Sequence, residues 1–486
     1  MPKISRREML ERSMVAAAAA ASATSFAGPG LASEVKPYGA KAGANERVRL
    51  ALVGVGGRGM QHLGPLLQMR DVCEVAALCD VDENVIARAA KYIEDKSGKK
   101  PAYVKDYRKL LEDKSIDAVS IATPHHWHAL QALWAIQAEK DAYVEKPVSH
   151  NVWEGRKVVE AARKHGRIVT QGSQRRSWPS HMEAMKFLHS GKIGTLKSVH
   201  GICYKGRGSI GKKKDGPVPP GVDYDLWLGP APVRPFNPNR FHYNWHWHWD
   251  YGNGDLGNTG VHDMDIIVWG IRKTELPRRI VSLGGRFGYE DDGETPNTQI
   301  VALEYDDLPI TYEVRGLRTE KYLDVNMAAI FRCADGYLVA ANGPVAAFDS
   351  GGKVIQAFGA RGDDEPHFRN FVDAVKSREP ESLRVGVLDG HLGSGFCHLP
   401  NISYRLGTMK PLSTKEPFGA FAQGNECYER VTKHLKENGV DLEKTQFRMG
   451  RALAFDPKTE TIVGDAEANP LLRREYRKPF VVPENV

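Results

Sequence analysis

Lys146 is the residue whose type and setting point most directly to chemistry. It follows residues 141–145, which are typical of a short buried parallel strand, and Pro147 ends that strand because proline cannot donate to a sheet ladder. The carboxyl ends of parallel strands face the crevice in which open α/β sheets bind ligands. A lysine there can place a cation beside a reacting oxygen, whereas an isolated Lys-Pro would be an ordinary surface lysine.

Asn258 and His262 are two further polar residues that could act with Lys146. They are four positions apart, so they share one face if the segment that runs to Trp269 is a helix. His262 could take the proton of a hydroxyl while Lys146 stabilises the developing alkoxide and hydride leaves for a nicotinamide. Asn258 would orient the reacting groups. The alternative for His262 is a structural histidine, but together the three residues predict oxidation of a polyol.

An aromatic segment, residues 241–250, precedes these two residues. As a strand it would divide its side chains between two faces, with His246, His248 and Asp250 on one and Trp245, Trp247 and Trp249 on the other. We interpret the tryptophans as a wall that stacks on a sugar, beside a hydrogen-bonding face. The predicted substrate contacts are Trp245, Trp247, His246 and His248, in addition to Lys146 and His262. A metal bound by the histidines is the alternative.

A glycine-rich turn, residues 54–59, indicates a dinucleotide site. It follows the apolar strand 47–53, and Asp80 ends the next strand about twenty residues later. Asp80 can accept hydrogen bonds from both ribose hydroxyls and would repel a 2′-phosphate, so NAD is favoured over NADP, although Arg58 could weaken that preference. The predicted cofactor contacts are Gly54, Gly56, Gly57, Arg58, Gly59, Asp80, Thr123, Pro124, His125, His128, Glu145 and Lys146.

The elements that must position these residues divide the chain into two domains. Strands and helices alternate over residues 46–172, which predicts a doubly wound Rossmann domain. Over residues 173–410 a long strand at 196–204 and later alternating strands predict an α+β domain with an open, largely antiparallel mixed sheet. Residues 411–486 read as a C-terminal extension that wraps the core. The predicted fold class is α/β.

The N-terminus reads as a targeting segment. Ser5-Arg6-Arg7-Glu8-Met9-Leu10 and the Ala-rich residues 13–27 resemble a twin-arginine signal peptide over residues 1–33, followed by a flexible lead-in at 34–45. The apolar stretch is too short for a membrane span. We therefore expect a periplasmic or otherwise exported protein; a disordered basic tail is the alternative. Because soluble NAD belongs to the cytoplasm, an exported enzyme must hold its cofactor tightly and end each cycle at its starting oxidation state.

Composition excludes some classes of partner. The net charge of +7 is mild, and no basic stripe with interleaved aromatics is present, so we expect no nucleic-acid partner. The six cysteines show neither disulfide nor zinc spacing, which predicts buried thiols. No metal is predicted for the site. The expected partner is a small-molecule carbohydrate substrate.

Taken together, these motifs resemble the Gfo/Idh/MocA oxidoreductases over roughly residues 46–410. The resemblance rests on the glycine turn 54–59, Thr123-Pro124, Glu145-Lys146-Pro147, Gly260-Val261-His262 and Asp265. It implies that Lys146 is the catalytic lysine and His262 the acid/base. It also implies a Rossmann domain joined to an open mixed sheet used for oligomerisation, hence a homo-oligomer (dimer or tetramer). The export signal, aromatic segment and long tail resemble a secreted branch of the family.

This sequence departs from the family pattern at Asn258. The dehydrogenases usually carry Asp there, and Asn cannot shuttle protons, so proton transfer would fall to His262 or Lys146. His125 likewise stands where Asn is common. Three hypotheses follow: NAD-dependent oxidation of a sugar, cyclitol or glycoside; redox-neutral glycoside cleavage or epimerisation through a transient keto intermediate; or a non-catalytic sugar-binding protein that retains NAD.

Overall fold

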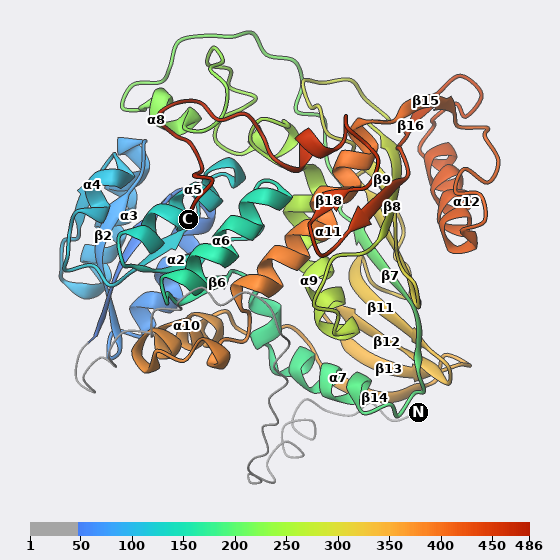
Figure 1. The fold of residues 1–486 in the computed structure, drawn as a ribbon, viewed down its shortest axis with the longest axis horizontal. Coiled ribbons are helices and arrows are strands. Elements are labelled where there is room, and N and C mark those ends of the chain that lie inside the picture. Colours follow the sequence, from blue (N-terminus) through green and yellow to red (C-terminus); the bar gives the residue numbers. More distant parts are fainter. Residues whose placement is uncertain (1–46) are drawn as a thin grey trace. The chain divides into compact units, whose positions relative to one another are not determined.

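A parallel six-stranded sheet is the first element of the computed structural model, which describes residues 47–486 (Figure 1). The predicted signal peptide (1–33) and lead-in (34–45) lie outside the described residues. The strand order β3-β2-β1-β4-β5-β6 is that of a doubly wound fold. Its strands are β1 Val48–Val53, β2 Cys73–Cys79, β3 Ala102–Val104, β4 Ala118–Ile121, β5 Asp141–Val144 and β6 Val169–Gln171. The intervening helices are α2 Gly57–Gln68, α3 Glu83–Ser97, α4 Tyr107–Leu111, α5 His125–Gln137 and α6 Val152–Lys164.

The second sheet is mixed and mostly antiparallel, as the sequence predicts. It has 12 strands, and its only parallel pair along the main path of the described sheet joins β7 to β10. Its central strands are β7 Leu196–Tyr204, β8 Arg279–Gly285, β9 Thr298–Tyr305, β10 Leu308–Arg315, β11 Met327–Cys333 and β12 Gly336–Ala341. The outer strands are β13 Val345–Asp349, β14 Val354–Gly359, β15 Thr408–Pro411, β16 Gln446–Met449, β17 Leu453–Asp456 and β18 Thr461–Ile462.

Helices cover both faces of this sheet because successive side chains of a strand point to opposite faces, and here the side chains on both faces are apolar. Val301 and Leu303 of β9 pack into the core that contains α9 (Val261–Ile271) and α11 (Val387–Arg405). Ile300 and Ala302 of the same strand pack against α12 (Ala422–Glu437). The remaining helices are α7 Pro179–His189, α8 Tyr224–Leu228 and α10 Glu365–Ser377.

Two late segments return to the first sheet. Helix α10 buries Phe368 and Phe371 in the core formed with β1 and α2, although it lies within the span predicted as the second domain. The last residues of the chain bury Phe480 and Val482 against α5, and Figure 1 places the C-terminus beside α5 and α6. Thus the end of the C-terminal extension packs on the Rossmann core, whereas its helix α12 and strand β16 belong to the second domain.

Replacing Phe480 tests whether this extension is a structural part of the fold. Its ring is 3% exposed and lies 5.4 Å from that of Trp127 between ring centroids. We expect Phe480→Ala to lower the free energy of unfolding by ~3–5 kcal/mol, because a large buried ring leaves a cavity. Denaturant titration measures this. The control, Val481→Ala at a side chain that is 39% exposed, should stay within ~0.5 kcal/mol of wild type. Equal stabilities for all three proteins would contradict a packed extension.

The aromatic segment differs from its predicted structure. It forms a 3-10 helix, Asn244–Trp247, rather than a strand, so the predicted two-faced alternation is wrong. Two of its backbone N–H groups donate locally, from His246 to the Tyr243 carbonyl and from His248 to the Trp245 carbonyl. The physical reason is packing: rings of this segment join a cluster with Trp227 instead of pairing with a strand.

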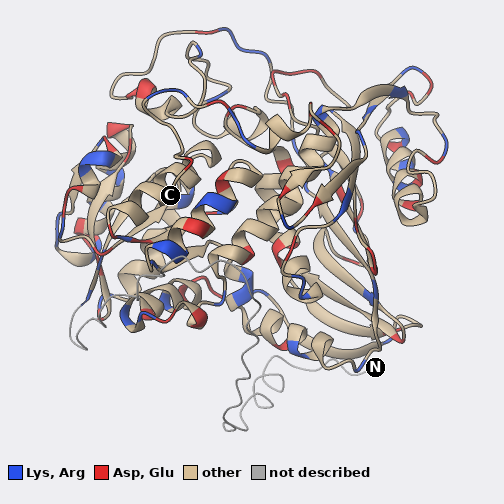
Figure 2. Ribbon diagram, viewed as in Figure 1, with Lys and Arg blue, Asp and Glu red and all other residues tan. Residues whose placement is uncertain are grey.

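The charge distribution and the cysteines agree with what the sequence predicts. Basic and acidic residues are interspersed along the described ribbon (Figure 2), so the positive net charge is not gathered on one element. All six cysteines are free, and five of them are buried, as predicted. Within residues 47–486, no helix has the length and apolar character needed to cross a membrane.

Candidate active site

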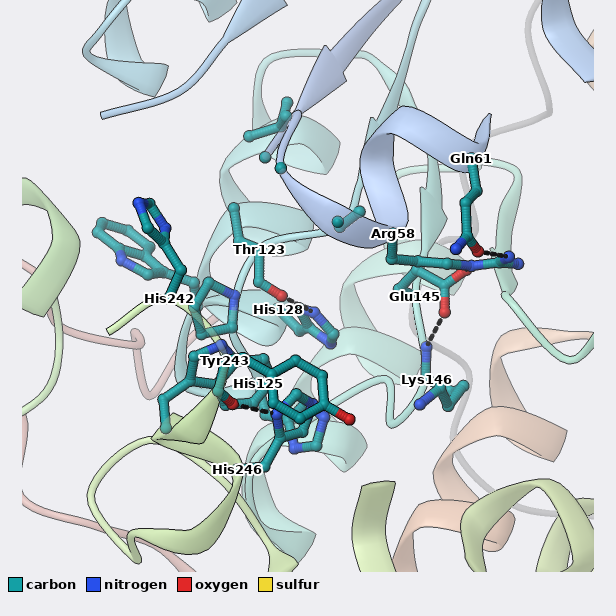
Figure 3. A pocket seen from close by; sticks show the side chains of 18 of the residues that line it. Arg58, Gln61, Thr123, His125, His128, Glu145, Lys146, His242, Tyr243 and His246 are labelled. Carbon is teal, nitrogen blue, oxygen red and sulfur yellow. Dashed lines mark hydrogen bonds and ion pairs between the residues drawn. The ribbon is translucent and has the colours of Figure 1, made fainter. Parts of the chain in front are cut away.

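The carboxyl ends of β1, β2, β4 and β5 open onto one cavity of about 790 Å³. Gly54, Asp80, Thr123 and Lys146 line it from these strand ends. Loops and helix starts of the second domain complete its wall. In Figure 3, Arg58, Glu145 and Lys146 lie together on one side of the cavity, and His125, Tyr243 and His246 lie together on another. A volume of this size is in the range of cofactor and substrate sites.

The glycine turn has the geometry that a pyrophosphate needs. Gly54 has a φ of +79°, and a Cβ there would lie 2.8 Å from the Ala122 carbonyl, so both conformation and space require glycine. A Cβ on Gly59 would lie 1.8 Å from the Gly54 carbonyl oxygen, so a side chain at position 59 would prevent α2 from packing this closely on the turn. By contrast, a Cβ on Gly56 or Gly57 would meet nothing within 4 Å. The space before these two residues, at the N-terminus of α2, therefore fits a phosphate group.

Asp80 is fixed beside this turn. Its carboxylate accepts hydrogen bonds from the Val55 N–H at 2.7 Å and the Asp82 N–H at 3.1 Å. Burial raises the pKa of Asp80 from its usual value, and these two hydrogen bonds oppose the rise. Arg58 is engaged elsewhere, by Glu145 at 2.8 Å and Asp364 at 3.3 Å. The residues present thus fit NAD, with a carboxylate for the ribose hydroxyls.

Cofactor choice can be tested at Asp80. We expect Asp80→Ser to weaken NAD binding and to shift the NAD/NADP preference toward NADP by about tenfold or more, since a charge pair at ~4 Å is worth ~1–4 kcal/mol. Titration of both cofactors by fluorescence gives the two dissociation constants. The control is Asp113→Ser, an exposed carboxylate outside the cavity. A wild-type protein that already prefers NADP would refute this role of Asp80.

Lys146 is held at the mouth of β5 by Asn258. Its ammonium donates to the Asn258 backbone carbonyl at 2.7 Å and to the side-chain Oδ1 at 3.2 Å. Burial lowers the pKa of Lys146 to about 8. The neighbouring Glu145 carboxylate accepts from Arg58 and lies 3.0 Å from His62 Nε2. Although burial opposes it, the Arg58 guanidinium and His62 hold the pKa of Glu145 well below its usual value.

His262 faces the same cavity from the first turn of α9. Asn258 lies just before it in a π-helical turn, Leu256–Gly260, so the predicted helix has a local π-bulge of the kind frequent at functional sites. Burial, and then the Lys146 cation, lower the pKa of His262 well below its usual value. His262 is therefore neutral near pH 7 and can accept a proton.

The structure brings most of the predicted site residues together. Those that line the cavity are Gly54, Gly56, Gly57, Arg58, Asp80, Thr123, Pro124, His125, His128, Glu145, Lys146, Trp245, His246, Asn258 and His262. Gly59 supports the turn from behind. Trp247 and His248 do not line this cavity: Trp247 borders a smaller one with Arg207 over its ring, and His248 Nε2 lies 3.1 Å from the Asn239 carbonyl. The prediction that Trp247 and His248 contact the substrate is corrected accordingly. Both residues lie outside this cavity because the segment is not a strand.

His125 and His128 have different surroundings. The two ring nitrogens of His128 lie 2.6 and 2.7 Å from the carbonyl oxygens of Pro147 and Thr123. His128 therefore ties the ends of β4 and β5 together. His125 has Nδ1 3.2 Å from Asn253 Oδ1, and its ring meets Trp245 edge-on at 4.7 Å between centroids. His125 lines the cavity, and Nε2 is the ring nitrogen that is not held by Asn253.

Sequence reasoning missed several residues of the cavity wall. Tyr243, Lys205 and Arg361 come from loops of the second domain. Gln174 follows β6, and its Oε1 is buried without a hydrogen-bond partner among the described residues, as expected for a ligand acceptor. Its place just after a parallel strand is the signal that could have found it.

Two family models match the chain. One, described as an oxidoreductase family with an NAD-binding Rossmann fold, matches residues 48–173. The other, the C-terminal alpha/beta domain of an oxidoreductase family, matches residues 195–307. The NAD prediction is confirmed at this level, because the matched Rossmann domain contains the glycine turn and Lys146.

Curated relatives and solved structures agree with these matches. A glycosyl hydrolase family 109 protein of Saccharopolyspora erythraea is 31% identical over 202 residues, covering 40% of this chain and 44% of that protein. An inositol 2-dehydrogenase of Salmonella typhimurium is 32% identical over 158 residues, covering 32% of this chain and 46% of that protein. The chain thus spans less than half the length of these curated relatives. The fold resembles that of the WlbA dehydrogenase from Bordetella pertussis, solved with NADH and UDP-GlcNAcA, with a TM-score of 0.53, 18% identity, and coverage of 72% of this chain and 94% of that one.

Proposed function

The chain belongs to the Gfo/Idh/MocA family of oxidoreductases, and from this premise we propose that it oxidises a hydroxyl of a sugar, cyclitol or glycoside with NAD. The observation that carries the proposal is the meeting of Lys146, Asn258 and His262 in the cavity that also contains the glycine turn. A cation, a neutral base and a dinucleotide cradle in one site are the parts that this oxidation needs.

Each of the three side chains has a distinct task. His262, neutral near pH 7, accepts the proton of the reacting hydroxyl. The Lys146 ammonium stabilises the alkoxide oxygen that forms, and Asn258 holds that ammonium in place through two hydrogen bonds. Bound NAD would supply the acceptor for the hydride of the carbon–hydrogen bond. Arg58 and His62 keep Glu145 ionised next to Lys146, which supports its positive charge.

Redox-neutral glycoside cleavage or epimerisation is the second candidate. In it, bound NAD would accept the hydride from the carbon of a ring hydroxyl and return it at the end of the cycle. Between these two steps the proton beside the new carbonyl is acidic, so the glycosidic bond can break by elimination and water can add in its place, or the centre can be reprotonated on its other face. The similarity to a glycosyl hydrolase family 109 protein supports this candidate. A third possibility, a sugar-binding protein that retains NAD without turnover, rests on Asn258 in place of a proton-transferring Asp.

Export adds a requirement to the proposal. The support for export is the Arg6-Arg7 motif and the Ala-rich stretch after it. An exported enzyme would be loaded with NAD before export, hold it with an affinity of roughly −10 kcal/mol or better, and regenerate it in place. We therefore propose that the protein acts outside the cytoplasm with retained cofactor. We also propose a homo-oligomer, because the resemblance implies that the open mixed sheet is used for oligomerisation.

The test is nucleotide content followed by turnover. The mature protein is purified from the exported fraction, denatured, and the released NAD(H) is quantified; the native protein is then assayed with sugars, cyclitols and aryl glycosides. We expect bound nucleotide, and a change in nicotinamide absorbance with a cognate sugar. Release of the aglycone without net NADH would select the second candidate. No response to any of these compounds, even with NAD added, would refute both catalytic proposals.

A further inference from the structure

The wall that the second domain contributes to the cavity contains cations but no carboxylate. After residue 173, the charged residues that line the described cavity are Arg175, Lys205 and Arg361, in addition to its histidines. The acidic lining residues, Asp80, Asp106 and Glu145, all belong to the Rossmann domain. A substrate that lies against the second domain therefore meets only neutral and positive side chains.

These cations differ in whether the protein already neutralises them. Arg175 is paired with the buried Asp263 carboxylate at 2.5 Å. Arg361 lies over the Trp178 ring at 5.5 Å and makes no ion pair within residues 47–486. The Lys205 ammonium has neither an ion pair nor a hydrogen bond in the described part of the chain, although its backbone N–H donates to the Arg315 carbonyl at 3.1 Å. Lys205 thus has a fixed backbone and an exposed, unpaired cation that lines the cavity.

Lys205 lines the same cavity as Lys146. It directly follows β7, whose last residue, Tyr204, donates its N–H to the Asn326 carbonyl at 2.7 Å, so the strand end is tied on both sides. Burial is the main cause of the lowered pKa of Lys146, and Lys205 and Arg207 lower it further. Arg207 is already neutralised by Asp255 at 2.7 Å. Lys205 therefore adds positive potential at Lys146, and its own cation is not offset by an ion pair in the described part of the chain.

We propose that the substrate is an anionic sugar, one that carries a carboxylate or a sulfate, and that Lys205 binds this group while Lys146 acts on a hydroxyl. The inference rests on the proposed function and names its substrate class. An anionic group at Lys205 forms charge-assisted hydrogen bonds with an ammonium that the protein leaves unpaired, and this leaves Lys146 free for the hydroxyl. Arg361, at the same wall, adds positive potential that attracts such a sugar. The NAD pyrophosphate does not fulfil this role, because its cradle is the glycine turn on the opposite domain.

The test is equilibrium binding of three classes of sugar to the NAD-loaded protein. Calorimetry compares neutral hexoses, the corresponding hexuronates and the corresponding sulfated hexoses, at low and high salt. We expect at least one anionic class to bind about tenfold or more tightly than its neutral counterpart, with a preference that shrinks as salt is raised. A preference for hexuronates identifies a carboxylate, and a preference for sulfated hexoses identifies a sulfate.

Variants assign the preference to Lys205. Lys205→Met should abolish the anionic-to-neutral ratio of affinities, whereas Lys205→Arg should keep most of it. The control is Lys212→Met, an exposed lysine of the same loop that pairs with Glu290 at 3.1 Å; it should leave the ratio unchanged. Neutral sugars that bind as tightly as both anionic classes, no binding by any class, or an unaltered ratio in Lys205→Met would overturn the inference. Because binding is measured without turnover, a neutral sugar that binds and reduces the nicotinamide leaves the proposed function standing.

Discussion

Lys146→Ala is expected to lower kcat by ~10²–10⁴ while NAD binding stays within a factor of two or three of wild type. The loss follows from the proposed mechanism, in which the Lys146 ammonium, held by Asn258 at 2.7 and 3.2 Å, is the cation at the reacting oxygen. The cofactor is retained because the glycine turn and Asp80 bind it at the other end of the cavity. Steady-state kinetics and nucleotide content of the purified variant measure the two effects. Turnover close to that of wild type would remove Lys146 from the mechanism.

The pH dependence gives an independent measure of the same group. The pKa of Lys146 is lowered to about 8, so the ammonium is present at neutral pH and is lost as pH rises through that value. We therefore expect kcat/KM to fall on the alkaline side, with a midpoint near the pKa of this lysine. Lys146→Arg serves as the matched control, because arginine stays charged throughout this range. Any activity it retains should lack the alkaline fall; an unchanged profile would assign the titration to another group.

His262→Gln is expected to cost ~10²–10⁴ in kcat, because glutamine can hydrogen-bond a hydroxyl but cannot accept its proton. The pKa of His262 lies well below its usual value, chiefly through burial. His262 is consequently neutral from pH 6.5 upward, and wild type should show no acidic fall between pH 6.5 and 8. A pH-rate profile of both proteins checks the expectation. The control is His189→Gln on α7, whose Nε2 lies 3.0 Å from the Gly270 carbonyl, outside the cavity. An acidic midpoint near 6.5, or full activity in His262→Gln, would contradict the role.

The regular elements of the fold could be predicted where local pattern and tertiary packing agree. The alternation of apolar strands with amphipathic helices over 46–172 predicted all six strands of the first sheet, and β7 has the predicted bounds. Strands β11, β13 and β14 were not predicted. They lie at one side of the second sheet, and β14 is exposed along most of its length, so it lacks the apolar pattern of a buried strand.

The aromatic segment shows where pattern and packing disagree. Alternating aromatic and polar residues have the period of a strand, but no neighbouring strand is available to pair with residues 241–250. Trp245 instead packs with Trp227 and Tyr251, and the backbone turns to allow it. The energy of burying these rings decides the local conformation, and this is a property of the folded chain rather than of the segment.

The site was predictable to the extent that its residues end strands or begin helices. Lys146, Asp80 and the glycine turn follow parallel strands, so topology alone directs them to the crevice. Lys205 follows β7 of the mixed sheet, and Arg361 lies in a loop before α10. Nothing in their local sequence shows that they share a cavity with Lys146, because the two domains must first pack together.

The most direct test of the central claim, that Lys146 and His262 serve oxidation by bound NAD, is a single turnover with isotope transfer. A cognate sugar deuterated at its ring carbons is mixed with the NAD-loaded protein, and after rapid denaturation the nicotinamide is analysed by mass spectrometry. We predict deuterium on the nicotinamide of wild type and none on that of Lys146→Ala within the same time. A sugar that binds wild type but transfers no deuterium would contradict the oxidoreductase account and leave a protein that retains NAD without using it.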